Sequence, residues 1–112
     1  MEKFSVNKSF DLFIDTLGHL DEKHLICDSD LEFFVLEELD GDAYTFLHPI
    51  TVDTLINAEL VPSSIGNVVK ALRDLIIKLL ENKRDLHSIK NDIQWKNARS
   101  IAKSILVKIK EK

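Results

Sequence analysis

The apolar residues between positions 65 and 80 recur at intervals of three and four, and this spacing strongly limits how the second half of the chain can fold. One face of an α-helix collects residues at such intervals, so the pattern predicts a long amphipathic helix. Ser63 or Ser64 is a suitable N-cap, and the basic segment Asn82-Lys83-Arg84 suits the C-terminal end. The apolar stripe consists of Ile65, Val68, Val69, Leu72, Leu75, Ile76, Leu79 and Leu80.

Three other segments have helical spacing. The first is capped by Ser9 and extends to about residue 20, and the second is short and begins at Thr51. The third runs from near Asp92 to near the end of the chain, while residues 84–92 form either a separate helical turn or a loop. The apolar residues of the first segment are Phe10, Phe13, Ile14, Leu17 and Leu20, and those of the last are Ile93, Ala98, Ile101, Ala102, Ile105, Leu106 and Ile109.

Residues 24–48 differ from these helical segments and predict strands. Leu31–Leu39 and Ala43–Leu47 are rich in aromatic and aliphatic side chains and flank Asp40-Gly41. An Asp-Gly dipeptide in this position favours the type I′ turn of a hairpin, which would place Val35 opposite Phe46. We therefore expect an α+β fold in which a small antiparallel sheet, either a β-hairpin or a three-stranded meander, packs against three to four helices. The 112 residues suit a single domain, residues 1–112, with a helical C-terminal half.

Charge is distributed very unevenly along the chain. Residues 1–60 contain 14 Asp and Glu against 3 Lys and Arg, whereas residues 61–112 contain 5 against 12. The net charges are thus −11 and +7, within a total of −4. This layout predicts an acidic surface for a basic partner, a basic surface for an anionic partner, or two halves that lie side by side and partly neutralise each other.

The sequence contains no recognisable catalytic, metal-binding or cofactor-binding motif. His19, His24, Cys27 and Asp28 are close in sequence but match no zinc spacing, and we interpret them as a helix-end histidine, a strand-start histidine, a buried thiol and a turn residue. No general base is adjacent to Cys27 that would make it a nucleophile. We therefore expect a protein that is not an enzyme and that has no cofactor and no bound metal.

Two further site types are excluded by position. An EF-hand loop beginning at Asp28 would require glycine at its sixth position and glutamate at its twelfth, where this chain has Phe33 and Leu39. The three glycines are isolated from one another, so they cannot form a phosphate-binding loop.

The N-terminal residues lack the features of a signal peptide, and no apolar run approaches the length of a membrane span. These features predict a cytoplasmic protein with no membrane partner.

In size, charge and composition the chain resembles small bacterial immunity proteins, such as those paired with contact-dependent growth inhibition toxins. The resemblance implies an antitoxin-like inhibitor that binds a basic toxin, for example a nuclease. Charge complementarity would accelerate this association, and inhibition would require no chemistry. The expected partner-binding residues are Asp28, Asp30, Glu32, Glu37, Glu38, Asp40, Asp42 and Tyr44.

The alternative is a nucleic-acid-binding or regulatory protein that uses the basic C-terminal helices. Their positive side chains include Lys96, Arg99, Lys103, Lys108 and Lys110. The acidic half would repel phosphate, which disfavours nucleic acid as the partner. Self-association is also open, because the acidic half of one copy could bind the basic half of another.

Overall fold

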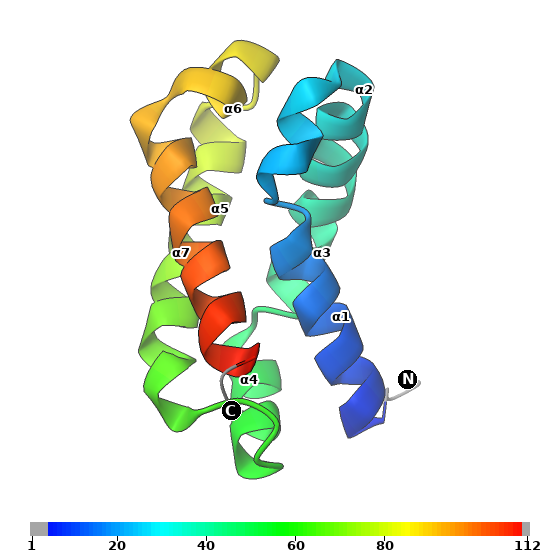
Figure 1. The fold of residues 1–112 in the computed structure, drawn as a ribbon, viewed down its shortest axis with the longest axis vertical. Coiled ribbons are helices and arrows are strands. Elements are labelled where there is room, and N and C mark those ends of the chain that lie inside the picture. The colour runs from blue at the N-terminus through cyan, green and yellow to red at the C-terminus, as the bar shows by residue number, and fades with distance from the viewer. Residues whose placement is uncertain (1–4, 111–112) are drawn as a thin grey trace.

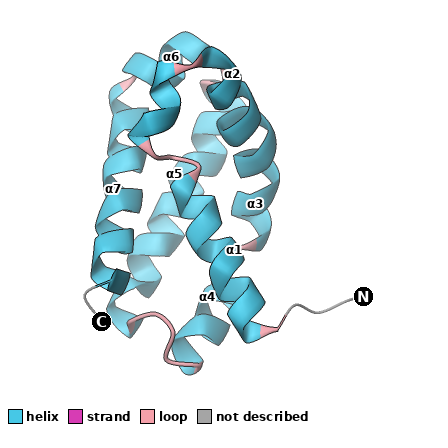
Figure 2. Ribbon diagram, turned by 45° about the vertical axis from the view of Figure 1, so that its right-hand side comes forward, coloured by secondary structure: helices cyan, strands magenta, loops and turns pink. Residues whose placement is uncertain are grey.

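A computed structural model describes residues 5–110, and within that range the chain is helical with short connecting loops (Figure 2). Residues 5–110 contain no strand, so the predicted antiparallel sheet, whether hairpin or meander, is wrong. The predicted α+β class is therefore replaced by an all-helical arrangement over the described range.

The helices follow one another with few intervening residues. In chain order they are α1 (Val6–Gly18), η1 (Glu22–Ile26), α2 (Asp28–Leu31), η2 (Glu32–Leu39), α3 (Asp40–Thr45), α4 (Pro49–Asn57), η3 (Ser63–Ile65), α5 (Gly66–Asn82), α6 (Leu86–Asn91) and α7 (Ile93–Lys110). The segments η1 and η3 are 3₁₀ turns, and η2 has π-helical hydrogen bonding. The helices predicted in the second half of the chain are confirmed, including α7 from near Asp92 to the end of the described range. The predicted N-cap of the long helix is wrong, because Ser63 and Ser64 lie in the 3₁₀ turn η3 and neither forms a cap hydrogen bond.

The two halves of the chain lie side by side (Figure 1). Helices α5, α6 and α7 form one side of the molecule, α1, α2 and α3 form the other, and α4 lies at one end. Helix α5 packs along α7, α1 contacts both α4 and α7, and α3 contacts α5. The buried side chains form one hydrophobic cluster, whose largest members include Trp95, Phe13 and Leu55.

Two helices begin earlier than the sequence predicts. Helix α1 is capped by Ser5, whose hydroxyl accepts a hydrogen bond from the Lys8 amide at 3.1 Å, and Ser9 lies inside the helix. Helix α4 is capped by His48, whose Nδ1 accepts from the Ile50 amide at 3.1 Å. Pro49 occupies the first turn of α4, where it suits the helix because its missing N–H would have no intrahelical partner.

The segment predicted as a hairpin is instead one continuous helical stretch, residues 28–45, made of α2, η2 and α3. Its buried positions are Leu31, Val35, Leu39 and Ala43, which recur every four residues rather than every two. Gly41 does not have the positive φ that a type I′ turn requires. An α-helix has about 3.6 residues per turn, and the wider π-helical winding of η2 keeps the four apolar residues in line.

Hydrogen bonds fix the corner where α5, α6 and α7 meet. The buried Trp95 donates its indole N–H to the carbonyl of Lys83 at 2.9 Å, which satisfies a group at the end of α5. The Lys83 ammonium donates to Asp92 at 2.6 Å, and the Arg99 guanidinium donates to the carbonyl of Ile89 at 2.6 Å. Trp95 is therefore a core residue at the start of a helix and is not available as a surface anchor.

No helix in residues 5–110 combines the length and the apolar character needed to cross a membrane.

Candidate functional site

The helical stretch of residues 28–45 has four distinct faces because its surroundings repeat every four residues. Positions 31, 35, 39 and 43 are buried, whereas positions 33, 37, 41 and 45 are all exposed. Positions 30, 34, 38 and 42 are half-buried, and the last three lie on the side of α1 and η1. Positions 36 and 40 are half-buried on the side of α5. The predicted partner-binding residues are therefore distributed over different faces.

On the α5 side, two arginines hold the stretch in place. Arg84 donates one guanidinium N–H to the carboxylate of Asp40 at 2.9 Å and another to the carbonyl of Leu36 at 2.6 Å. The guanidinium carbon of Arg73 lies 5.8 Å from the centroid of the Tyr44 ring, within the range of a cation–π contact. Asp40 thus has a partner within the chain, and Tyr44 is held against α5.

On the α1 side, Phe34 stacks on two histidines. The centroid of its ring lies 5.6 Å from that of His19 and 4.3 Å from that of the buried His24. Nε2 of His19 also lies 3.1 Å from the carboxylate of Asp42, and Glu38 is close to both groups. These contacts are made by residues that lie far apart in the sequence, and they place Glu38 and Asp42 away from the exposed face.

The remaining predicted acids divide into one paired residue and three that are unpaired. Asp28 forms an ion pair with Lys90, so Lys90 and Arg84 each link the basic half of the chain to the acidic half. Within the described residues, Asp30, Glu32 and Glu37 form no ion pair with Lys, Arg or His. The two halves therefore neutralise each other in part, and most of the acidic excess remains.

Four exposed residues of the stretch supply negative charge and aromatic rings. Glu32 and Glu37 are exposed, and the side chains of Phe33 and Tyr44 are each 47% exposed. We call Glu32, Phe33, Glu37 and Tyr44 the outer acidic face. Three of them were predicted partner-binding residues. Phe33 was not among them, because that prediction selected acidic residues and counted Phe33 only as an apolar residue of a strand.

The exposed position of Phe33 could have been inferred from the sequence. Leu31, Val35 and Leu39 recur every four residues, and a residue two positions from each of them lies on the opposite side of such a helix. Phe33 packs edge-on against Phe34, with ring centroids 4.9 Å apart, which restricts its motion.

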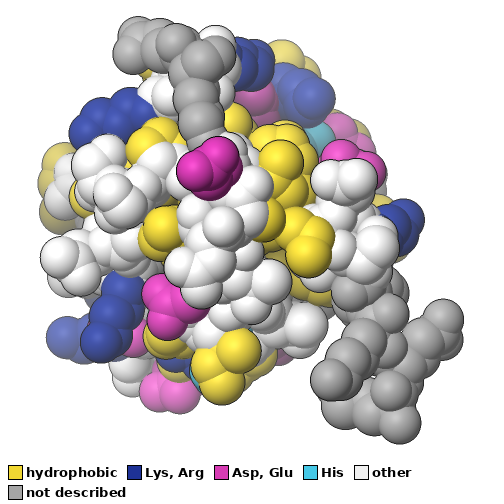
Figure 3. Space-filling model, turned by 90° about the horizontal axis from the view of Figure 1, so that it is seen from below, with side chains coloured by type: hydrophobic (Ala, Val, Ile, Leu, Met, Phe, Trp, Pro, Cys, Tyr) yellow, Lys and Arg dark blue, Asp and Glu magenta, His cyan; other side chains and the backbone are white. Residues whose placement is uncertain are grey.

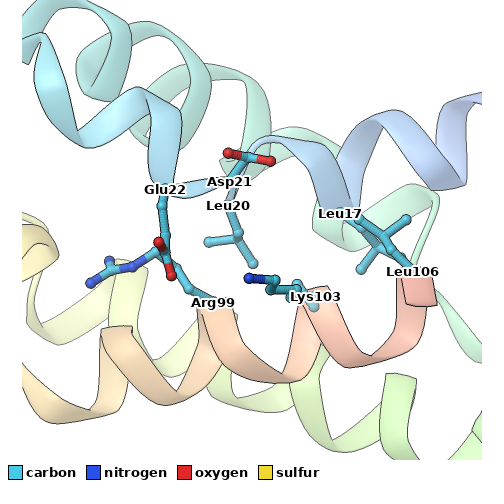
Figure 4. Close-up of a pocket in the computed structure, with 8 residues that line it drawn as sticks. Leu17, Leu20, Asp21, Glu22, Arg99, Lys103 and Leu106 are labelled. Carbon is cyan, nitrogen blue, oxygen red and sulfur yellow. The ribbon is translucent and has the colours of Figure 1, made fainter. Parts of the chain in front are cut away.

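A hollow of about 110 Å³ separates α7 from the end of α1 and the start of η1 (Figure 4). Leu17 and Leu106 lie together at one end of it, and Glu22 and Arg99 lie at the other. Arg99 is buried, and its burial lowers the pKa of the guanidinium, while the nearby Glu22 carboxylate opposes that shift. Arg99 therefore supports the α6–α7 corner and does not belong to an exposed basic surface.

Cys27 is exposed, so its interpretation as a buried thiol is wrong. Its Sγ lies 3.0 Å from the Ser29 hydroxyl. This hydrogen bond, followed by the influence of the nearby backbone amides of Asp30 and Ser29, lowers the pKa of the thiol. The amides point toward Cys27 because it precedes α2 and occupies the N-cap position.

The end of the molecule near α4 has a different surface character. In Figure 3, hydrophobic and uncharged side chains occupy much of the middle of this end, and most Lys, Arg, Asp and Glu lie toward its margin. Neither a continuous acidic surface nor a continuous basic surface is visible from this side.

Comparison with known proteins does not assign the chain to a family. No protein-family model matches it. No curated protein and no solved structure matches it significantly.

Proposed function

We propose that this protein is an inhibitor of the immunity type, which binds a basic partner protein through the outer acidic face. The observation that carries the proposal is the position of Glu32 and Glu37. Both carboxylates are exposed beside the half-exposed Phe33 and form no ion pair within the described chain.

The composition of the face suits association with a basic protein. Unpaired carboxylates attract positive charge over distances of about 10 Å at moderate salt, which raises the association rate. Aromatic side chains at the centre of an interface contribute a large share of binding energy. Phe33 supplies such a ring next to Glu32 in the sequence and one helical turn before Glu37, and Tyr44 supplies a second exposed ring further along the same stretch.

The face is also held in place before binding. Phe33 packs on Phe34, Tyr44 lies against Arg73, and the helical backbone of residues 28–45 carries the whole surface. A preorganised surface loses less conformational entropy on binding than a flexible loop does. An inhibitor of this kind would act by covering its partner, without contributing a reactive group.

The nucleic-acid alternative has less support from the positions of its side chains. Arg99 is buried and donates to the carbonyl of Ile89, so it is not available to phosphate. Lys96, Lys103 and Lys108 are exposed along α7. Recovery of nucleic acid is therefore kept as a possible outcome of the experiment described next.

The test is affinity capture from the organism that encodes the chain, with two charge-reversal variants. The variant Glu32→Lys/Glu37→Lys alters the outer acidic face. The control Asp11→Lys/Asp53→Lys changes net charge equally at exposed positions on α1 and α4. Circular dichroism establishes that both variants are folded.

The proposal predicts that the wild type and the control recover one basic protein that the outer-face variant does not recover. The purified chain should then abolish that protein's activity at an equimolar ratio. Equal recovery by all three proteins, recovery of nucleic acid instead, or a recovered protein whose activity is unchanged would each contradict the proposal.

A further inference from the structure

We propose that His19, Glu38 and Asp42 form a binding site for a divalent transition-metal ion, for which Zn²⁺ is the appropriate probe. One potential ligand atom from each of the three side chains lies within 4.8 Å of the other two. His19 follows the end of α1, Glu38 belongs to η2, and Asp42 belongs to α3. A metal ion held here would join α1 to the helical stretch of residues 28–45.

The donor set suits zinc chemistry. Imidazole nitrogen and carboxylate oxygen are common Zn²⁺ ligands, with bond lengths of about 2.0–2.2 Å, so two ligands of a tetrahedral site lie roughly 3.3 Å apart. Nε2 of His19 and Oδ2 of Asp42 lie 3.1 Å apart, close to that spacing. Rotation of the half-buried Glu38 side chain would bring its carboxylate to the same ion.

The charges around the cluster also favour a cation. Two carboxylates converge beside one histidine, and within the described residues neither forms an ion pair with Lys or Arg. Asp28 and Asp40, on other faces of the same helical stretch, each have such a partner. The side chains of His19 and Asp42 are 12% and 27% exposed, so the charge of the Asp42 carboxylate is less screened than that of a fully exposed group.

The surrounding residues orient the ligands. The imidazole of His19 stacks on Phe34, and Phe34, Glu38 and Asp42 recur every four residues on one face of the stretch. Positioning residues of this kind strengthen metal binding because the ligands lose less freedom. Glu38 belongs to the π-helical element η2, and π-helical segments occur frequently at functional sites.

One nitrogen and two carboxylate ligands favour a transition metal over Mg²⁺ or Ca²⁺, which prefer sites made of oxygen atoms. Three protein ligands leave a position for water in a tetrahedral site. The cluster lies on the α1 side of the stretch and not on the outer acidic face, so this inference does not depend on the proposed function.

The test is calorimetric titration of the purified, metal-free chain with ZnCl₂, with MgCl₂ in a parallel series. All proteins carry Cys27→Ser, which removes the exposed thiol as an unrelated zinc ligand. The site variants are His19→Gln, Glu38→Gln and Asp42→Asn. The controls are Glu37→Gln, on the neighbouring exposed position, and His87→Gln, on the exposed surface of α6.

We expect one equivalent of Zn²⁺ to bind the reference protein and both controls. Each site variant should bind about 10-fold more weakly or worse, since changes to outer-shell groups alone already cost about 10–100-fold. Thermal unfolding provides the second measurement, in which Zn²⁺ should raise the Tm of the reference and the controls by more than that of Glu38→Gln or Asp42→Asn. If His19→Gln does not fold, the nearly isosteric variants Glu38→Gln and Asp42→Asn are sufficient to test the site.

Undiminished zinc binding in Glu38→Gln and Asp42→Asn would overturn the site, as would loss of binding in His87→Gln. Equal affinity for Mg²⁺ and Zn²⁺ would overturn the assignment of His19 as a ligand.

Discussion

Arg84 and Asp40 lie 44 residues apart in the sequence, and their side chains form a 2.9 Å ion pair that links the basic half of the protein to the acidic half. The same guanidinium donates to the carbonyl of Leu36, which belongs to the π-helical element η2. Arg84 therefore connects the end of α5 to the stretch that carries the outer acidic face.

Replacing Arg84 by alanine should lower the free energy of unfolding by about 1 kcal/mol, which combines a weak exposed ion pair with one lost hydrogen bond. Arg84→Lys should be more stable than Arg84→Ala but less stable than the wild type, because lysine lacks the planar guanidinium that reaches both acceptors. Urea denaturation measures both variants, with the exposed Lys78→Ala on α5 as the control. A loss in Lys78→Ala equal to that in Arg84→Ala would show that net charge, and not this contact, accounts for the effect.

The ion pair between Lys83 and Asp92 should make stability depend on acidity. The Lys83 ammonium, followed by the Gln94 amide, lowers the pKa of the Asp92 carboxyl in the folded protein. The unfolded chain then binds the proton more readily, so the stabilisation is present at neutral pH and is lost as the pH falls through the lowered pKa.

Asp92→Asn should thus reduce stability at pH 7 and have a progressively smaller effect below the ordinary aspartate pKa of about 3.9. The measurement is the difference in the free energy of unfolding between this variant and the wild type from pH 7 to pH 2. Asp53→Asn, at an exposed position on α4, is the control. A difference that stays constant over the whole range would contradict the assignment.

The thiol of Cys27 should react faster than an ordinary exposed cysteine near neutral pH. The Ser29 hydroxyl and the amides at the start of α2 stabilise the thiolate, which is the nucleophilic form. Ser29→Ala should raise the thiol pKa and reduce the rate of alkylation by iodoacetamide at pH 7. Above pH 10 the two proteins should react at similar rates; an unchanged rate at pH 7 would exclude Ser29 as the cause.

Long amphipathic patterns predicted their helices well, whereas short apolar segments did not. Helices α5 and α7 span several turns, so their apolar stripes are unambiguous. Helix starts were less certain because several capping residues follow one another, as with Ser5 and Ser9. In residues 28–45, the sequence prediction followed the strand-favouring side chains and the Asp40-Gly41 dipeptide. The four-residue spacing of the apolar residues, which indicates a helix, was the more informative feature.

The candidate sites depended on contacts that local sequence does not contain. Asp40 pairs with Arg84, and Asp42 contacts His19 from 23 positions away. The acidic composition drew attention to residues 28–44, but the packing of α1 and α5 determines which of those carboxylates stay exposed. The four-residue spacing of the buried positions would alone have identified Phe33 as an exposed residue.

Both proposed sites rest on residues 28–45 being a helix, and Gly41→Ala tests that arrangement most directly. Gly41 has no positive φ, and a Cβ atom added there would meet nothing within 4 Å. Alanine should therefore raise the free energy of unfolding by about 0.5–1 kcal/mol, the usual gain over glycine inside a helix. A loss of stability of that size in urea denaturation would instead indicate the hairpin turn, in which alanine is strained, and would contradict the helical account of both sites.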